Sequence, residues 1–276
     1  MMKRVGRLVA GETIKLGAQP FLYVALGILA FVTLAAAFLL PLMSGQKPSV
    51  WREPHAAMLF SYGFGFGLKT AMFVLVILSS MMFAGEFDRG TIKNLLTRPL
   101  TRLEFFVAKC LTVAGLGVLL YGFVFAVAAV YALTFGSVGP VWDDTVYTIQ
   151  RTEPEITRHF RKAILFSVLS FLAAGFLGIL VSNFTESSGY AVATGLVIFV
   201  AADLVTGLLK DHAKQKVFFY YASYAIDRLT KLSEGTNASW NQDIDAHLLW
   251  LQVPLYSMVL FVPAAYAIFR SRNITA

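Results

Sequence analysis

Residues 86–102 read EFDRGTIKNLLTRPLTR and lie between two long apolar runs, residues 59–84 and 110–135. Each run exceeds the roughly 20 residues that a helix needs to cross the hydrocarbon core of a bilayer. Hydrophobic residues make up 57% of the 276-residue chain and charged residues 14%, whereas about a quarter of a typical soluble domain is charged. The sequence therefore predicts a membrane protein in which residues 86–102 connect two transmembrane helices.

Six apolar windows have the length of a transmembrane helix. They cover approximately residues 21–42, 59–84, 110–135, 163–181, 189–208 and 248–269. We therefore expect an all-α integral membrane protein with six transmembrane helices. An N-terminal interfacial helix, a short cytoplasmic helix within residues 86–102 and an outer amphipathic helix between the fifth and sixth spans complete the predicted fold.

The segment 86–102 has the signals of a short helix of its own. Gly90 and Thr91 open it, with Thr91 as a possible cap, and Pro99 ends it after about two turns. The apolar residues that share one face of this helix are Ile92, Leu95 and Leu96. Such a face can dock in a groove of a soluble partner. The alternative is a solvated loop whose arginines only enforce orientation.

The same segment resembles the first cytoplasmic loop of ABC-2 type permeases, the membrane subunits of ABC exporters. The matching residues are Glu86, Gly90, Thr91, Ile92, Leu95, Leu96, Pro99 and Arg102, with Lys109 just before the next span. The resemblance implies that the matching residues from Glu86 to Arg102, together with Arg98, couple the chain to a separate ABC ATPase, in two copies. It also implies one ABC-2 type transmembrane domain over residues 1–276, a second permease copy, most simply in a homodimer, and a place in the bacterial cytoplasmic membrane.

The first 18 residues predict an interfacial helix that leads into the first span. Apolar residues recur at about helical spacing among basic ones, a pattern that suits a membrane surface. Arg4, Arg7 and Leu8 belong to this segment, and in the resembled family such a helix contacts the ATPase. The alternative is a frayed cationic tail.

The distribution of Lys and Arg supports one orientation in the first half of the chain and opposes it in the second. With the N-terminus inside, nine of these residues lie inside and two outside in the first half, and the ratio reverses in the second. Because the first helix usually dominates the positive-inside rule, we expect both termini to be cytoplasmic.

Two more helices are predicted near the outer side. Thr152 and Glu155 form a possible capping box, with Pro154 in the first turn, so a helix should begin there and continue into the fourth span. Between residues 216 and 233, apolar residues at spacings of three and four predict an amphipathic helix that rests on the outer membrane face or plugs the exit. Its stripe consists of Phe218, Tyr221, Ala225, Leu229 and Leu232.

Lys69 and Asp203 are charges within predicted spans. At about 1.5 Å per residue, Lys69 lies ~22 Å from residue 84 and Asp203 lies ~21 Å from residue 189, so the two share a depth. Ionisable groups at such depth tend to face a partner or a cavity. We expect either that Lys69 and Asp203 pair or line the translocation path, or that both extend to outer headgroups.

Several functional classes lack their signatures in this sequence. No Gly-x-x-x-x-Gly-Lys-Ser/Thr segment is present, so ATP and Mg²⁺ are expected on the partner ATPase and no cofactor or metal on this chain. The net charge of +7 comes from short interruptions between apolar runs, which does not suit a nucleic-acid binder. The single cysteine, Cys110, excludes an intramolecular disulfide. A non-transporting membrane anchor for a soluble partner and a secondary transporter remain as alternatives, and the sequence does not identify a substrate.

Overall fold

The computed structural model describes residues 2–43, 55–90, 101–139, 141–142, 149–234 and 240–272. The elements are α1 (Met2–Gly17), α2 (Pro20–Met43), α3 (Ala56–Asp88), α5 (Arg102–Phe135), α6 (Glu153–Phe184), α7 (Ser188–Leu208), α8 (Asp211–Lys214), α9 (Phe219–Ser233), α10 (Gln242–Ala246) and α11 (Leu249–Ser271), with strands β1 (Val141–Trp142) and β2 (Ile149–Arg151). The two strands form a short antiparallel pair. In the described part of the chain the fold is therefore all-α apart from this short pair of strands.

Six of the helices are long and apolar enough to cross a membrane, namely α2, α3, α5, α6, α7 and α11. Each contains one of the six predicted windows almost completely, which confirms the predicted number and order of spans. Three of them, α3, α5 and α6, have 33, 34 and 32 residues. Because about 20 residues suffice to cross the hydrocarbon core, these three helices must extend beyond it.

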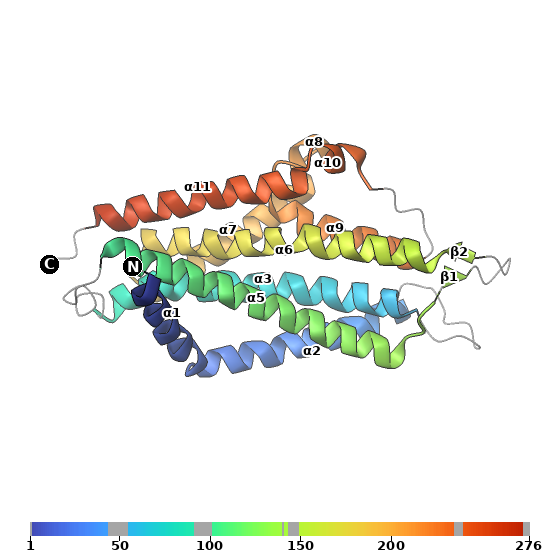
Figure 1. The fold of residues 1–276 in the computed structure, drawn as a ribbon, viewed down its shortest axis with the longest axis horizontal. Helices are drawn as coiled ribbons and strands as arrows, with labels where there is room; N and C mark the ends of the chain where they lie inside the picture. Colours follow the sequence, from blue (N-terminus) through green and yellow to red (C-terminus); the bar gives the residue numbers. More distant parts are fainter. Residues whose placement is uncertain are drawn as a thin grey trace.

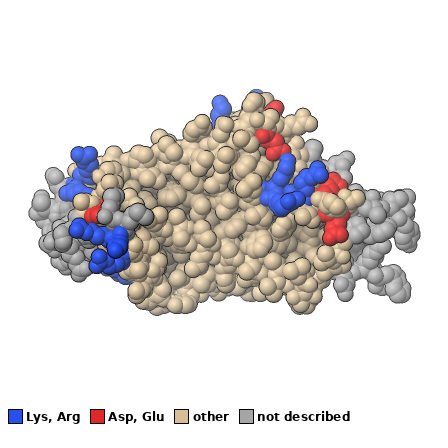
Figure 2. All heavy atoms as spheres, viewed as in Figure 1, with Lys and Arg blue, Asp and Glu red and all other residues tan. Residues whose placement is uncertain are grey.

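The long helices run side by side along the long axis of the molecule (Figure 1), and both chain termini lie at the end where α1 is found. We call this end the terminal end, and the opposite end, which carries β1 and β2, the hairpin end. Figure 2 shows charged side chains near both ends and at the edge where α8 and α10 lie, with a broad uncharged band between them. On the face shown, this distribution suits a bilayer around the middle of the bundle, because charged side chains are costly in the hydrocarbon core.

Helix α3 is the centre of the bundle, because it packs against α2, α5, α6, α7 and α9. Its large apolar side chains Phe64, Leu68, Leu75 and Phe83 are at most 1% exposed. Small residues bring its neighbours close: a Cβ added at Gly178 on α6 would lie 1.9 Å from Ser79 Oγ. The crossing of α3 and α6 therefore depends on the missing side chain at Gly178.

N-cap residues mark the starts of α5 and α6, and the capping interaction predicted for α6 is incorrect. Thr101 and Glu104 form a complete capping box at the start of α5. At α6 the N-cap is Thr152, as expected, and a proline lies in the first turn, but the Thr152 side chain makes no capping hydrogen bond. The predicted start of this helix is correct and the predicted capping box with Glu155 is wrong.

Helix α9 has the predicted apolar stripe, and this stripe packs against other helices of the bundle. The stripe residues are all buried: Phe218, Tyr221, Ala225, Leu229 and Leu232. They pack against α6 and α3, so that α9 lies alongside these spans in the half of the bundle near the hairpin end (Figure 1). The stripe faces protein, and α9 forms part of the bundle wall.

Candidate functional site

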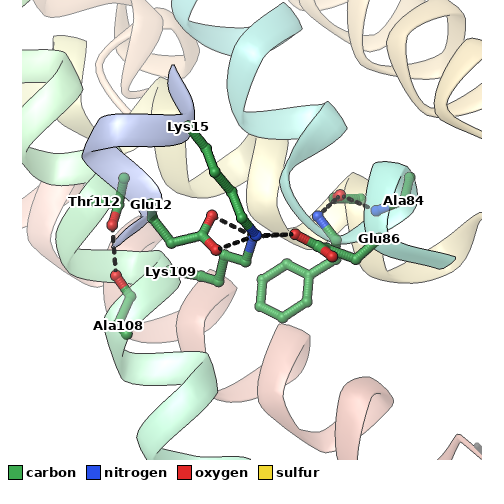
Figure 3. A network of polar contacts seen from close by, with 9 residues as sticks. Glu12, Lys15, Ala84, Glu86, Ala108, Lys109 and Thr112 are labelled. Carbon is green, nitrogen blue, oxygen red and sulfur yellow. Dashed lines mark hydrogen bonds and ion pairs between the residues drawn. The ribbon is translucent and has the colours of Figure 1, made fainter. Parts of the chain in front are cut away.

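Four charged side chains meet at the terminal end, where α1, the last turn of α3 and the first part of α5 come together (Figure 3). Lys109 Nζ on α5 lies 2.6 Å from Glu12 Oε2 on α1 and 3.3 Å from Glu86 Oε1 on α3. Lys15 Nζ lies 3.0 Å from Glu12 Oε1 and 2.9 Å from Glu86 Oε1. We call these four residues, Glu12, Lys15, Glu86 and Lys109, the charge cluster.

The inner part of the charge cluster is removed from solvent. The Lys109 side chain is 2% exposed, and those of Glu12 and Glu86 are 10% and 11% exposed. Lys109 also lies 5.3 Å from the centre of the Phe105 ring. A buried charge requires a partner, because the desolvation cost of an unpaired one is several kcal/mol. The cluster therefore fixes α1 and α3 against the same point on α5.

Lys15 lies on the solvent-exposed side of the charge cluster. Partial burial would lower the pKa of Lys15, but hydrogen bonds with Glu86 and Glu12 outweigh this effect and raise the pKa above its ordinary value. Lys15 therefore remains an ammonium group throughout the physiological range. Two ammonium groups then balance the two carboxylates.

The last turn of α3 is attached to α6 by an uncommon contact. The hydroxyl oxygen of Ser182 accepts hydrogen bonds from the backbone N–H groups of both Phe83 and Ala84, each at 2.9 Å. In a helix these groups normally donate to the carbonyl four residues earlier. A side chain that enters this ladder marks a place where a helix bends readily. Residues 85–88, with Glu86 among them, follow this place directly.

The two described ends of the segment 86–102 are joined to the last spans. Asp88 Oδ2 accepts a hydrogen bond from Ser188 Oγ, at the start of α7, over 2.6 Å. Arg102 donates to the carbonyl oxygens of Arg270 and Arg272, at the end of α11, over 2.8 and 3.2 Å. A basic side chain is favourable at the carbonyl end of a helix. A displacement of this segment would therefore act on α7 and α11 as well as on α1 and α5.

The structure places the predicted coupling residues in different surroundings. Glu86 lies in the last turn of α3 rather than in a loop, and Gly90 follows that helix with a left-handed φ of 64°. Arg102 is the first residue of α5. The other predicted coupling residues lie outside the described residues: Thr91, Ile92, Leu95, Leu96, Arg98 and Pro99.

A helix is present where the sequence predicts one for residues 1–18, as α1; its place at a membrane surface stays a prediction. Arg4 and Arg7 are exposed on it and Leu8 is half-buried. Glu12 was not predicted as a site residue; it lies on the face that α1 turns toward the protein, with Val5 and Leu16. An acidic residue in helical register with apolar ones was the available signal, because such a residue requires a buried partner.

The structure also brings Lys69 and Asp203 together, which confirms the predicted pairing. Lys69 Nζ on α3 lies 2.8 Å from Asp203 Oδ2 on α7. The side chains are 50% and 38% exposed, because they line an open groove of about 280 Å³ between α3, α7 and α9. Two charges predicted to share a depth are thus paired on the wall of this groove.

Neither the charge cluster nor the groove beside Lys69 and Asp203 has, in its described residues, the side chains of a metal site. Among the residues that the structure describes, no group of three or more His, Cys, Asp or Glu side chains is arranged to hold a metal ion.

Comparisons with known proteins give a family and two relatives. The family model described as "ABC-2 family transporter protein" matches residues 8–202, a range that includes the charge cluster, Ser182 and Lys69. "Uncharacterized protein YhcI" of Bacillus subtilis (strain 168) is 26% identical over 216 residues, which are 76% of this chain and 66% of the relative. "Uncharacterized membrane protein YdbK" of the same organism is 26% identical over 135 residues, which are 49% of this chain and 51% of the relative. The chain thus matches between half and two thirds of the length of these relatives.

Proposed function

Since the chain belongs to the ABC-2 family of transporter proteins, we propose that it is the permease subunit of an ATP-driven ABC exporter. It carries the substrate path, and a separate ABC ATPase binds and hydrolyses ATP with Mg²⁺. Coupling uses the segment 86–102, through Glu86, Gly90, Thr91, Ile92, Leu95, Leu96, Arg98, Pro99 and Arg102, together with Arg4, Arg7 and Leu8 on α1.

The observation that carries this proposal is the position of Glu86 in the charge cluster. A partner that moves residues 91–100 displaces the last turn of α3, which the Ser182 contact joins to α6. Glu86 transmits the displacement to α1 and α5 through Lys15 and Lys109. Chains of packed side chains, hydrogen bonds and ion pairs of this kind can carry coupling between distant sites. The segment 86–102 is therefore suited to convert the motion of a soluble partner into a rearrangement of spans.

The same proposal covers assembly and location. Two ATPase copies act on two permease copies, in a homodimer within the bacterial cytoplasmic membrane, and both termini are cytoplasmic. In support, α1, both termini and the end of α3 lie at one end of the bundle (Figure 1). Lys69 and Asp203 line the substrate path nearer the opposite, hairpin end.

Co-purification tests this function. The tagged chain is isolated from its native membranes in mild detergent, and the associated proteins are identified by mass spectrometry. Leu95→Asp/Leu96→Asp removes the apolar face that would dock in the ATPase. Val138→Asp is the control, because Val138 is an apolar residue, 70% exposed, beyond α5 at the hairpin end.

The expected result is an ATPase with Walker motifs that accompanies the parent chain and the Val138→Asp variant and is lost from the double variant. A stable complex that contains no ATPase would contradict the proposal and favour a membrane anchor. An ATPase that stays with the double variant would show that coupling uses another surface.

A further inference from the structure

The groove between α3, α7 and α9 has the features of a ligand site. Helix α7 ends at Leu208 and α9 begins at Phe219, and both pack against α3. Their junction leaves a groove of about 280 Å³, which is close to the lower end of the range for small-molecule pockets. The groove is formed by two separate helices against a third, and spaces between the helices of a bundle are common places for ligand sites.

The charged side chains in the groove do not balance. Its lining contains one ammonium group, Lys69, and two carboxylates, Asp203 and Asp227. Lys69 and Asp203 neutralise each other at 2.8 Å. The second carboxylate, Asp227 on α9, remains as an excess negative charge on the wall of a mainly apolar groove.

Asp227 has a partner of its own, but that contact is weak. Lys231 Nζ lies 3.0 Å from Asp227 Oδ2, one turn further along α9, and the side chains are 46% and 52% exposed. Lys231 is not among the groove-lining residues. Exposed pairs of this i,i+4 type contribute only about 0.3–0.5 kcal/mol. A cation inside the groove can therefore bind Asp227 together with Lys231, or in place of Lys231, with little loss of free energy.

Aromatic rings supply the second part of the recognition. Phe66, Phe199 and Phe219 line the groove. Phe199 and Phe219 meet edge to face, with their centres 4.9 Å apart, and so join α7 to α9. An ammonium group over the face of an aromatic ring is attracted by the ring's quadrupole, whereas an anion there is repelled. Excess negative charge and aromatic walls thus favour the same class of ligand.

We propose that the groove binds an amphipathic organic cation, with its ammonium group near Asp227 and Asp203 and its apolar body against Phe66, Phe199 and Phe219. The identification of this cation as the transported substrate rests on the proposed function; the binding itself does not. Lys69 limits the affinity, because it occupies Asp203 and repels a second positive charge.

Binding is measured on the purified chain in nanodiscs of zwitterionic lipid, without ATPase or ATP. The probes are octyltrimethylammonium, octyl sulfate and octanol, which share one chain and differ in the charge of the head. Equilibrium dialysis with mass spectrometric detection gives the bound fraction, and empty nanodiscs give the partition into lipid. Thermal unfolding of each variant shows whether it is folded.

Two substitutions and one matched control test the assignment. Asp227→Asn should weaken octyltrimethylammonium binding about fivefold, as expected for the loss of one partly exposed ion pair, and leave octanol binding unchanged. Lys69→Gln should strengthen it. Asp245→Asn is the control, because Asp245 on α10 is also in an ion pair, 2.6 Å from Lys162, but does not line the groove; this variant should bind as the parent chain does.

Equal binding of octyl sulfate and octyltrimethylammonium would overturn the proposal, as would an unchanged affinity in folded Asp227→Asn. Either result would leave the permease function standing if the ATPase still co-purifies. Conversely, selective cation binding without an ATPase partner would retain the groove assignment and reject the exporter.

Discussion

Lys109 on α5 and Glu12 on α1 lie 97 residues apart in the sequence, yet their charged atoms are 2.6 Å apart in a nearly solvent-free position. Glu86 shares the same ammonium group at 3.3 Å. One lysine thus joins α1, the central span α3 and the next span α5. This contact holds α1, α3 and α5 together at the terminal end. The segment 86–102 begins at Glu86, which is part of the contact.

Removal of the Lys109 ammonium should be costly. Lys109→Met leaves the carboxylates of Glu12 and Glu86 largely buried beside one another with only Lys15 as counter-charge. Loss of one partner from a buried pair costs about 3–5 kcal/mol, so the melting temperature in detergent should fall steeply. Lys15→Met is the matched control, because Lys15 is 52% exposed and exposed pairs contribute about 0–1 kcal/mol. Equal effects of the two substitutions would show that burial does not govern the cluster.

The Ser182 contact predicts a local change in α3. Ser182→Ala removes an acceptor of the Phe83 and Ala84 N–H groups, and the loss of a typical hydrogen bond costs about 0.5–1.5 kcal/mol. Hydrogen exchange at these two amides should become faster, with little change in the preceding turns. Ser257→Ala is the control, since Ser257 Oγ donates to Val253 O within its own helix. Unchanged exchange would mean that the helix ladder of α3 closes without Ser182.

The main features of the fold were predictable from the sequence because bilayer thickness imposes a minimum length on each span. The windows around residues 59–84 and 110–135 fall within α3 and α5 for this reason. The extensions of these helices to Asp88 and from Arg102 were not predicted, because the charged residues within them, among them Glu86, Asp88, Glu104 and Lys109, mark the ends of the apolar windows. Glu86 was therefore assigned to a loop, although it lies in a helix.

The candidate site was only partly predictable, because it depends on contacts between distant residues. The equal depth of Lys69 and Asp203 follows from the helical rise alone, and their pairing was therefore within reach. The contact between Ser182 and the α3 backbone depends on the crossing of α3 and α6, to which an isolated serine gives no guide. Helix α9 shows the same limit, because an apolar stripe does not tell whether lipid or protein covers it.

Close packing of α3 and α6 gives a prediction about a glycine. In Gly178→Ala the new Cβ would lie 1.9 Å from Ser79 Oγ and 3.0 Å from Val76 O. The helices must separate, at a cost of about 1–3 kcal/mol for an overpacked site, and the melting temperature should fall. Gly115→Ala on α5 is the control, because nothing lies within 4 Å of its Cβ position. There the substitution should stabilise the helix by about 0.5–1 kcal/mol. A similar response at both positions would contradict the packing argument.

The Lys69–Asp203 pair gives a prediction about coupling between two substitutions. Each single change, Lys69→Met or Asp203→Asn, leaves the other charge without this partner at membrane depth, where an unpaired charge is unfavourable. The double variant leaves neither charge. The two effects on the free energy of unfolding in nanodiscs should therefore not add, and the double variant should be more stable than their sum predicts by about 1 kcal/mol, near the upper end for pairs with this exposure. Thermal unfolding of the parent chain and the three variants measures this difference. Strict additivity would show that water in the groove screens the pair, and that its 2.8 Å contact contributes no stability.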